Sequence, residues 1–220
     1  MGTSSLQSSV GHKLIMALSG FVLVGFLLAH LSGNLLIYGG PELINRYAEG
    51  LRQLGAILWV LRAVTLLAVI LHIRSALILT KRNREARPQD YAFKKSIKAS
   101  YASKTMMMSG LVILSFIFYH LAHLTFRWTH AQEFAHLGPF DVYVMMILSF
   151  KSPLVTSFYC LSVVLLMIHL YHGMVSIFQT LGLNHSPLNP VIKTVGPLLS
   201  IGLAIGFISI PISVFLGLLG

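Results

Sequence analysis

Five long stretches of apolar residues constrain this chain more than any other feature of its sequence. Their approximate bounds are Leu14–Tyr38, Ala56–Thr80, Met106–Phe126, Leu154–Thr180 and Val191–Leu219. Each is long enough for a transmembrane helix, which needs about 20 predominantly apolar residues. Only 10% of the residues are charged, whereas a soluble domain carries about 25%. The sequence therefore predicts an all-α membrane protein, a single domain over residues 1–220 with five transmembrane helices, and it excludes a soluble enzyme, a nucleic-acid-binding protein and a disordered chain.

The positive charge of the chain is concentrated between the second and third apolar stretches. Segment 81–104 carries eight basic residues, Lys81, Arg82, Arg84, Arg87, Lys94, Lys95, Lys98 and Lys104, against Glu85 and Asp90. Basic loops stay on the cytoplasmic side of a membrane. We therefore expect this segment and the amino terminus to be cytoplasmic, in the cell's inner membrane, with the carboxy terminus outside. The net charge of +10 thus indicates topology, and the same segment offers a surface to a cytoplasmic partner.

Four of the ten histidines lie deep inside predicted spans, one in each of the first four helices. They are His30, His72, His120 and His169. An ionisable side chain in a bilayer is energetically costly and indicates function by default. One such histidine is explained by a hydrogen bond between helices, but four of them, one per helix, require a common cause.

The depths of these histidines group them into two layers. The first and third helices run outward, and His30 and His120 lie roughly 14–17 residues, or about 21–26 Å, from the inner ends. The second and fourth helices run inward, and His72 and His169 lie about 15–16 residues from the outer ends. The two layers are then roughly 12–20 Å apart in a hydrocarbon core about 30 Å thick. Two stacked pairs are what bis-histidine haem ligation across a four-helix bundle requires.

An internal repeat relates the first helix to the third. Met16, Ser19, Gly20, Val22, Phe26, His30 and Leu31 recur ninety positions later as Met106, Ser109, Gly110, Val112, Phe116, His120 and Leu121. The second and fourth helices match more weakly, through an apolar run before each histidine and a small residue four positions after it. The repeat favours His120 over His123, and His169 over His172, as the equivalent ligands. Because both halves start inside, the repeat is parallel and predicts a pseudo-two-fold axis near the membrane normal.

The other histidines and the small residues have weaker interpretations. His123 and His172 lie one turn after His120 and His169. Each is interpreted either as an interfacial residue or as a neighbour of a haem propionate or a quinone. The remaining histidines, His12, His130, His136 and His185, are assigned to loops or interfaces. Gly20, Gly25, Gly33, Gly110 and Gly173 either leave room for a porphyrin or allow close helix packing. The single cysteine, Cys160, lies in an apolar run, so neither a disulfide nor a metal–thiolate site is expected.

Four segments carry a resemblance to a known family. They are GHKLIMALSGFVLVGFLLAHLSGN, LHIRSALILTKRNREARPQDY, KTMMMSGLVILSFIFYHLAHLTF and IHLYHGMVSIFQTLGLNH. They resemble the di-haem cytochrome b membrane subunit of succinate dehydrogenase and fumarate reductase, the respiratory complex II type, in its single-polypeptide, five-helix branch. The resemblance covers nearly the whole chain, and the last segment is its most specific part.

The resemblance implies a set of cofactors and partners. Two haem b groups would link a flavoprotein subunit and an iron–sulfur subunit, both on the cytoplasmic side, to a membrane quinone, expected to be menaquinone. Carried onto this chain, His72 and His169 hold the iron of the haem nearer the iron–sulfur subunit, and His30 and His120 hold the iron of the distal haem. The chain would then be a non-flavin subunit of the enzyme, with no dicarboxylate chemistry and no catalytic residue of its own.

The chain departs from part of that family in its acidic residues. Some fumarate reductases of this type have a transmembrane glutamate, whereas all six acidic residues here are expected in loops: Glu42, Glu49, Glu85, Asp90, Glu133 and Asp141. Proton transfer through a buried carboxylate is therefore not expected. A quinone pocket beside one of the haems has two candidate borders, His123, Tyr38 and Glu42 on the outer side or Lys13, Ser103 and Lys104 on the inner side. The lack of a buried carboxylate slightly favours the inner one.

Two functions of other classes stay open. The first is a di-haem cytochrome of a different quinone-reactive enzyme, such as a hydrogenase or a formate dehydrogenase, in which the histidines are usually placed differently. The second is a histidine-lined metal or proton transporter. A transporter would be expected to have carboxylates and broken helices within its spans, and this chain lacks the carboxylates.

Overall fold

A computed structural model describes residues 8–86, 101–183 and 189–220 of the protein, with side chains throughout except at 101–105 and 189. These residues form helices and connecting turns, without a strand. Five helical segments of the described chain are long and apolar enough to cross a membrane, as predicted. They are α1 (Ser9–Leu35) with the short 3-10 turn η2 (Leu36–Gly39), α3 (Ala56–Glu85), α4 (Tyr101–His120) with the π-helical turn η3 (Leu121–Thr125), α7 (Pro153–Thr180) and α8 (Asn189–Phe215).

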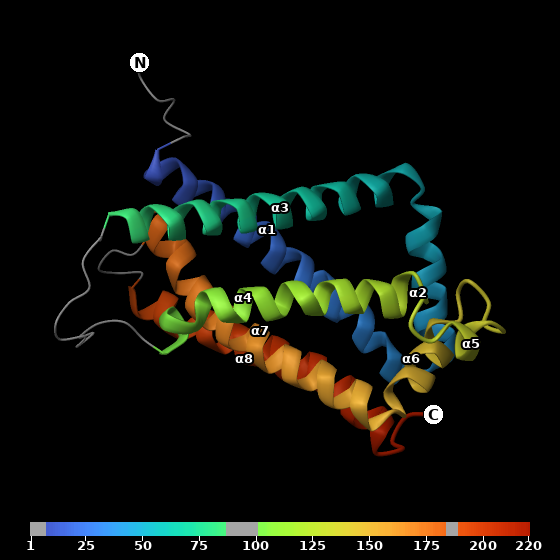
Figure 1. The fold of residues 1–220 in the computed structure, drawn as a ribbon. Helices are drawn as coiled ribbons and strands as arrows, with labels where there is room; N and C mark the ends of the chain where they lie inside the picture. Colours follow the sequence, from blue (N-terminus) through green and yellow to red (C-terminus); the bar gives the residue numbers. More distant parts are fainter. Residues whose placement is uncertain (1–7, 87–100, 184–188) are drawn as a thin grey trace.

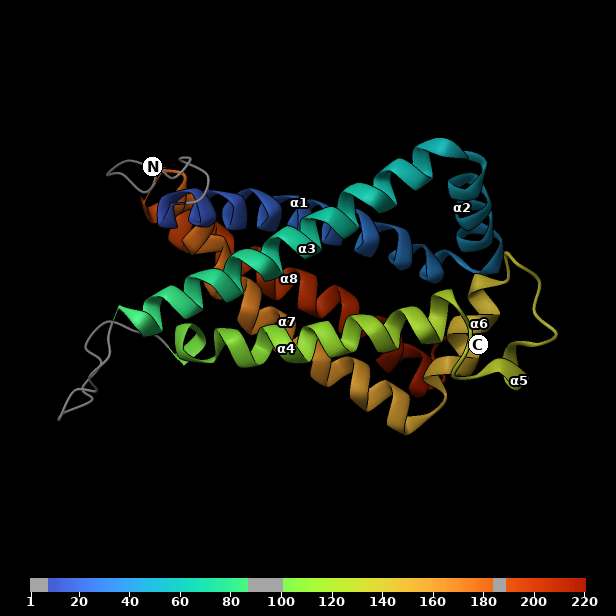
Figure 2. The ribbon, with the colours of Figure 1, turned by 45° about the horizontal axis from the view of Figure 1, so that its top comes forward.

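The two ends of the molecule carry different elements. Three helices that the sequence did not predict, α2 (Pro41–Gln53), α5 (Ala131–Phe134) and α6 (Val142–Phe150), gather with the carboxy terminus at one end, which we call the α2 end (Figure 1). The start of α1 and the end of α3 lie at the opposite, amino-terminal end (Figures 1 and 2). The start of α1 and the start of the basic segment therefore share one end of the molecule, while residues 1–7 and 87–100 lie outside the described residues.

The helices differ from the predicted spans mainly at their ends. α1 begins at Ser9 because the Ser8 hydroxyl accepts a hydrogen bond of 3.0 Å from the Gly11 amide. α3 continues to Glu85, whose carboxylate lies 3.8 Å from the Lys81 ammonium. α8 ends at Phe215, four residues before the predicted end. Hydropathy identifies only the apolar part of a helix, so it does not detect polar turns that extend the helix beyond that part.

The spanning helices pack on one another in a defined set of neighbours. α1 packs against α3, α7 and α8, and α7 packs against α4 and α8. A Cβ added at Gly206 of α8 would lie 2.7 Å from Leu31 of α1, and one at Gly196 would lie 3.0 Å from Met174 of α7. Small residues thus bring α8 close to both neighbours, as is common between helices in membranes.

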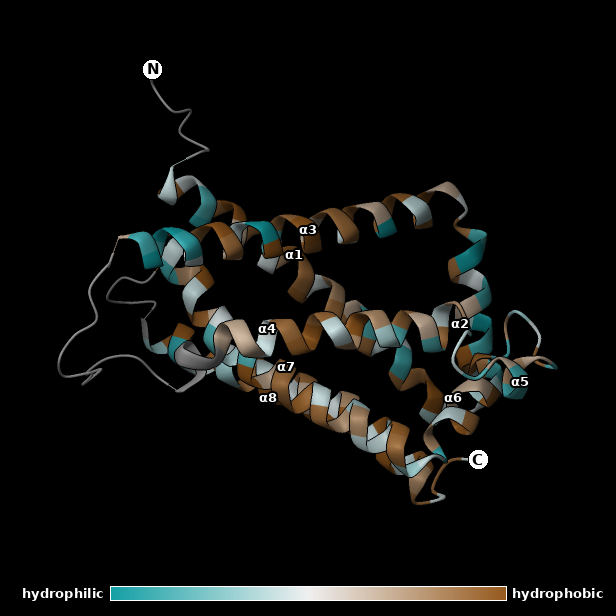
Figure 3. Ribbon diagram, viewed as in Figure 1, coloured by the Kyte–Doolittle hydropathy of each residue, from teal (hydrophilic) through white to brown (hydrophobic). Residues whose placement is uncertain are grey.

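Apolar surface is distributed unevenly among the five spans. Across the most apolar part of each, only 6% of α3 and 11% of the α4 span are buried in the protein, against 28% of the α1 span and 33% of α7 and α8. Hydrophobic residues nevertheless run along all of them (Figure 3). Large side chains such as Trp59 and Leu67 of α3 are 68% and 55% exposed. This surface is suited to contact with lipid, which agrees with a multi-pass membrane protein.

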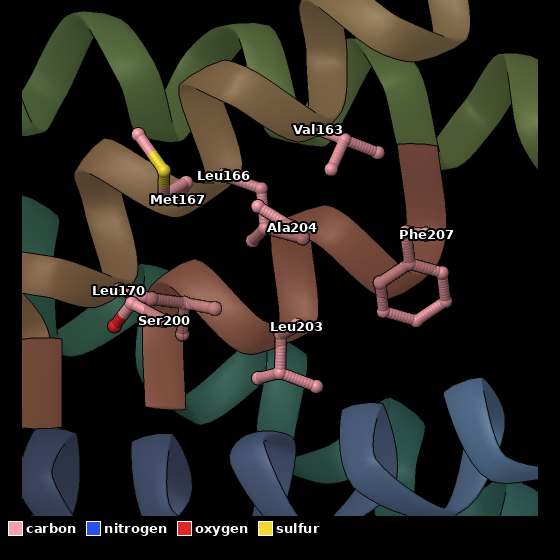
Figure 4. A pocket seen from close by; sticks show the side chains of 8 residues that line it. All are labelled: Val163, Leu166, Met167, Leu170, Ser200, Leu203, Ala204 and Phe207. Carbon is pink, nitrogen blue, oxygen red and sulfur yellow. The ribbon is translucent and has the colours of Figure 1, made fainter. Parts of the chain in front are cut away.

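A pocket lies between α7 and α8 (Figure 4). Its lining residues are Val163, Leu166, Met167, Leu170, Ser200, Leu203, Ala204 and Phe207. The hydroxyl of Ser200 donates to the Gly196 carbonyl of its own helix at 2.9 Å, so the lining presents an apolar surface. We interpret the pocket as part of the packing between the two helices.

α2 runs across the ends of the spanning helices (Figures 1 and 2) and is held there by two contacts. Its Tyr47 lies on α1 at Gly33, where an added Cβ would be only 2.5 Å from the tyrosine Cε1 atom. Its Asn45 accepts a hydrogen bond of 3.0 Å from the Tyr143 amide of α6 and donates one of 3.4 Å to the Asp141 carboxylate. The α2 end is therefore tied together by specific polar and steric contacts.

Candidate functional site: two histidine pairs

The structure brings the four histidines of the spans together as two pairs, the two that their depths indicate. His72 of α3 and His169 of α7 have ring centroids 6.3 Å apart, with the rings inclined by 62°. His30 of α1 and His120 of α4 have ring centroids 5.9 Å apart, inclined by 88°. We call them the 72/169 pair and the 30/120 pair. Each pair joins two helices of different repeats.

Both histidines of the 72/169 pair are held through Nδ1. His169 Nδ1 lies 3.2 Å from the Ser109 hydroxyl, which donates its own proton to the Met106 carbonyl at 3.0 Å. With that proton directed to Met106, the serine oxygen is free to accept a hydrogen bond from Nδ1 of His169. His72 Nδ1 lies 3.2 Å from the Met16 carbonyl, which can only accept. In both rings this network assigns the proton to Nδ1 and leaves Nε2 with a free lone pair.

The two histidines of this pair have matching surroundings on the helices that face them. Ser19 Oγ lies 3.5 Å from His72 Nδ1, as Ser109 Oγ does at 3.2 Å from His169 Nδ1. The next residue in each case is a glycine, and a Cβ added at Gly20 or Gly110 would lie 3.5 or 3.6 Å from the Cε1 atom of the neighbouring imidazole. Each ring thus lies over a Ser-Gly pair.

The 30/120 pair lies among aromatic side chains. Phe26 stacks on His30 with ring centroids 5.3 Å apart and an inclination of 11°, and Phe207 of α8 lies 5.9 Å away. The Asn34 amide donates to the His30 carbonyl at 2.7 Å and lies 3.4 Å from both ring nitrogens. His120 Nδ1 is buried, and no described residue hydrogen-bonds to it. This pair is therefore held by aromatic packing more than by hydrogen bonds.

His123 lies in a second aromatic cluster next to the 30/120 pair. The π-helical turn η3 carries it, and its side chain is fully buried. Its Nδ1 lies 3.0 Å from the Tyr159 hydroxyl, while its Nε2 is buried without a hydrogen-bond partner among the described residues. Phe134 of α5 stacks on its ring at 5.9 Å, and His130 lies 4.5 Å away between ring centroids. His123 is therefore enclosed by aromatic side chains, and its place beside a haem propionate or a quinone stays a prediction.

The remaining predicted site residues are spread over the molecule. His172 is half-buried on α7 and Lys13 is exposed on α1, while the side chains of Ser103 and Lys104 lie outside the described residues. The hydroxyl groups of Tyr38 and Ser213 are 3.0 Å apart, and Glu42 pairs with Arg46 at 3.5 Å. The placement of Tyr38 and Glu42 beside a quinone stays a prediction.

The described acidic residues lie at the ends of helices and in the segments that connect the spans. Glu42 and Glu49 belong to α2, Glu133 to α5, and Asp141 directly precedes α6. Glu85 is the last residue of α3. The two histidine pairs thus lie in spans whose central parts carry no carboxylate.

Several residues of these clusters were not predicted to have these roles. Ser19 and Ser109 stood out as part of the repeat, and as the polar members of an otherwise apolar pattern they are the signal that points to a contact with the histidines. Tyr159, Phe134 and His130 gave no such signal. Tyr159 reaches His123 from α7. Phe134 and His130 reach it because the loop after α4 folds back, and Arg127 secures that fold by donating to the Leu137 and Gly138 carbonyls at 3.4 and 3.2 Å.

Comparison of the chain with known protein families, curated proteins and solved structures finds no match. The chemistry of the site therefore has to be argued from its own geometry. Each pair supplies two imidazoles, and in the described chain no group of three or more histidine, cysteine or acidic side chains is arranged to hold a metal ion. A site built on these pairs must complete its coordination from elsewhere.

Proposed function

We propose that this chain is a membrane-anchor cytochrome b that carries two haem b groups, one held by each histidine pair. In this proposal it transfers electrons between an iron–sulfur subunit of succinate dehydrogenase or fumarate reductase and a membrane quinone. When bound, haem supplies an iron that gains and loses one electron. The residues of the chain hold that iron, fix its depth and exclude water from it.

The observation that carries the proposal is the contact that Nδ1 of each histidine of the 72/169 pair makes with an oxygen of a neighbouring helix. An imidazole that binds a metal typically donates its other N–H to an oxygen acceptor, which fixes the tautomer and orients the ring. His169 meets this requirement through Ser109, and His72 meets it through the Met16 carbonyl. The same Nδ1 contacts would also serve a bridge between helices, and what favours ligation is that each ring faces a second imidazole at a centroid separation of 6.3 Å.

The number of protein ligands in each pair favours haem over a bare metal ion. A metal bonded to two imidazole nitrogens at about 2 Å each has ring centroids about 6 Å apart, and the observed separations are 6.3 and 5.9 Å. A structural zinc site takes four protein ligands and a catalytic one takes three, whereas haem iron needs only axial ligands from the protein. The two imidazoles of each pair match the axial ligands that haem iron needs.

The two Ser-Gly pairs, one next to each imidazole of the 72/169 pair, support the proposal that the first four spans form a haem-binding four-helix bundle with an internal parallel repeat. The same residue types, in the same order, contact the imidazoles of His72 and His169 from α1 and α4. Contacts of α1 with α3 and α7, and of α4 with α7, are those of such a bundle. The two histidine pairs then lie on its two diagonals.

The topology supports the proposed partners. If the basic residues at the end of α3 mark the cytoplasmic side, the amino-terminal end faces the iron–sulfur and flavoprotein subunits and the α2 end faces outward. The dicarboxylate site and the flavin belong to those subunits. The resemblance of the sequence to the complex II family supports this assignment over a hydrogenase or a formate dehydrogenase.

The proposal is tested by purifying the protein with its native partners and recording a reduced-minus-oxidised visible spectrum with haem quantification. We expect two haem b per chain, together with a flavoprotein and an iron–sulfur protein. Absence of haem would overturn the proposal. Haem in the absence of those partners, but with a hydrogenase or a formate dehydrogenase, would support the alternative cytochrome.

A further inference from the structure

We propose that the outward face of α3 binds an anionic phospholipid, with the headgroup phosphate held between Arg74 and Lys81. The two cations lie on one face of the helix, together with an apolar groove that accommodates an acyl chain. The inference goes beyond the proposed function, because this face lies away from the 72/169 pair and needs neither haem nor quinone.

The first step of the argument is the direction of Arg74. On α3, Ser75 and Leu79 are only 2% and 8% exposed, so they lie on the side of the helix that packs against the protein. Arg74 is exposed, and at 3.6 residues per turn it lies about 160° around the helix from His72. Arg74 therefore points away from the 72/169 pair, toward the surroundings of the protein.

The second step is the groove in which Arg74 lies. The groove is open to the outside, has a volume of about 490 Å³ and is lined by Ile70, Ile73, Arg74, Leu77 and Ile78. All five residues belong to α3, and Arg74 is the polar one among them. Ile70 and Leu77 are each 52% exposed. The lining thus offers apolar surface to a hydrocarbon chain and one positive charge to its headgroup.

The third step is the charge of Arg74. A guanidinium stays protonated in proteins, and a charge within a bilayer is costly, so that such residues pair with an opposite charge or extend to the interface. The ion pairs among the described residues join Arg46 to Glu42 and Lys81 to Glu85. No side chain or carbonyl of the described residues accepts a hydrogen bond from the Arg74 guanidinium. Arg74 therefore needs an anion from its surroundings.

The fourth step is the position of Lys81 relative to Arg74. Lys81 follows Arg74 by seven residues, which is about 10 Å along the helix and within about 20° of two full turns. The two side chains therefore share one face of α3. Hydrophilic residues gather at this end of the helix (Figure 3), as expected where a span reaches the membrane interface. Long basic side chains extend along apolar surface to place their charge at the interface, so both cations can reach one phosphate.

The chemistry of the two cations favours an anionic phospholipid. A guanidinium can donate two parallel hydrogen bonds to phosphate oxygens, and an ammonium adds a point charge. Lys81 also lies 3.8 Å from the Glu85 carboxylate, but the two side chains are 78% and 63% exposed, and an exposed pair of this kind is weak. Two cations and one carboxylate leave a net positive charge. A headgroup with a net negative charge is therefore favoured over a zwitterionic one.

The site is tested on the purified full chain in detergent, by native mass spectrometry with added phosphatidylglycerol or phosphatidylcholine. We expect the first phosphatidylglycerol to bind more tightly than the first phosphatidylcholine. Arg74→Gln should weaken the binding of phosphatidylglycerol about fivefold, the effect of one basic residue at an anionic membrane surface, and leave that of phosphatidylcholine unchanged. Arg62→Gln is the matched control, because Arg62 is also exposed on α3 but lies over the Trp59 ring at 5.0 Å, near the other end of the helix.

The second cation provides a further comparison. Lys81→Gln should also weaken the binding of phosphatidylglycerol, and the double variant Arg74→Gln, Lys81→Gln should bind phosphatidylglycerol no better than phosphatidylcholine. Equal affinities of the wild-type protein for the two lipids would overturn the site. An unchanged affinity of Arg74→Gln for phosphatidylglycerol would overturn it as well.

A second arm uses the wild-type chain and so does not depend on the folding of a variant. Phosphatidylglycerol with a photoreactive headgroup is incorporated into membranes that hold the protein with its native partners, and the cross-linked peptides are identified after irradiation. We expect cross-links on α3 between Arg74 and Glu85. Cross-links confined to other helices would overturn the site. Cross-links on α3 that form only after the partners are removed would show that a partner protein covers the groove, and would also overturn the lipid as its occupant.

Discussion

The hydroxyl of Ser109 on α4 lies 3.2 Å from Nδ1 of His169 on α7, so that a serine of one helix fixes which nitrogen of a facing histidine carries the proton. Because the Ser109 hydroxyl donates to the Met106 carbonyl within its own helix, its oxygen is oriented to accept a hydrogen bond from the histidine. The ring nitrogen that remains free, Nε2, is then the one available to a metal. This relationship leads to the first prediction.

Ser109→Ala should weaken haem binding at the 72/169 pair about 10- to 100-fold, the usual effect of losing an outer-shell partner of a metal-bound histidine. The measurement is a haem titration of the purified apoprotein. Ser115→Ala is the matched control, because Ser115 lies on the same helix and donates only to the Leu111 carbonyl. Equal haem affinity in the two variants would show that Ser109 does not orient His169.

Replacing one histidine of a pair should remove one haem and leave the other. His72→Ala should lose the haem of the 72/169 pair, and His30→Ala should lose that of the 30/120 pair, because each iron needs both of its axial ligands. Haem quantification with visible spectra distinguishes the two losses. His172→Ala should retain both haems, and a His72→Ala protein that keeps both would rule out the assigned ligands. If the inner haem lies nearer the partners, His72→Ala should also weaken docking more than His30→Ala.

Assembly with the cytoplasmic subunits should depend on the basic segment 81–104. Changing Lys94, Lys95, Lys98 and Lys104 to glutamine should dissociate the complex at a lower salt concentration, because exposed charge pairs are screened over about 8–10 Å. Gel filtration across a salt series measures the effect. Arg46→Gln and Arg52→Gln remove positive charge from the α2 end instead and should leave assembly unchanged. If the lysine variant keeps wild-type salt tolerance, the segment serves topology alone.

The contact between α1 and α2 should be sensitive to a single added methyl group. Gly33→Ala should destabilise the protein by about 1 kcal/mol or less, the low end of overpacking, because the new Cβ would lie 2.5 Å from the far end of the exposed Tyr47 side chain, which can rotate away. Thermal unfolding in detergent measures the change. Gly202→Ala on α8, where an added Cβ meets nothing within 4 Å, is the control. The double variant Gly33→Ala, Tyr47→Ala should recover part of the loss, and a fully additive loss would show that the two residues do not interfere.

The spans and the grouping of the histidines were within reach of the sequence because both depend on regular geometry. Hydropathy locates an apolar helix, and the fixed rise per residue places His30 with His120 and His72 with His169. The ligation itself remains a prediction. The helices α2, α5 and α6 were not predicted because they are short and lie between spans, where no long apolar run indicates them. The contact of His123 with Tyr159 depends on the π-helical turn and the folded-back loop, which no local pattern indicates.

α3 is buried over only 6% of its most apolar part and packs on α1, so its depth is set largely by what it meets in the bilayer. Near one end, the exposed Trp59 stacks with Arg62 at 5.0 Å, and near the other the exposed Lys81 begins the charged turn. The stretch from Trp59 to Lys81 spans about 33 Å, close to the hydrocarbon thickness of about 30 Å, and aromatic and basic residues anchor a helix at the two interfaces. α7, by contrast, is fixed by its protein neighbours. The vertical alignment of His72 with His169 is therefore coupled to the thickness of the membrane, and that of His30 with His120 shares this coupling through α4, whose most apolar part is only 11% buried.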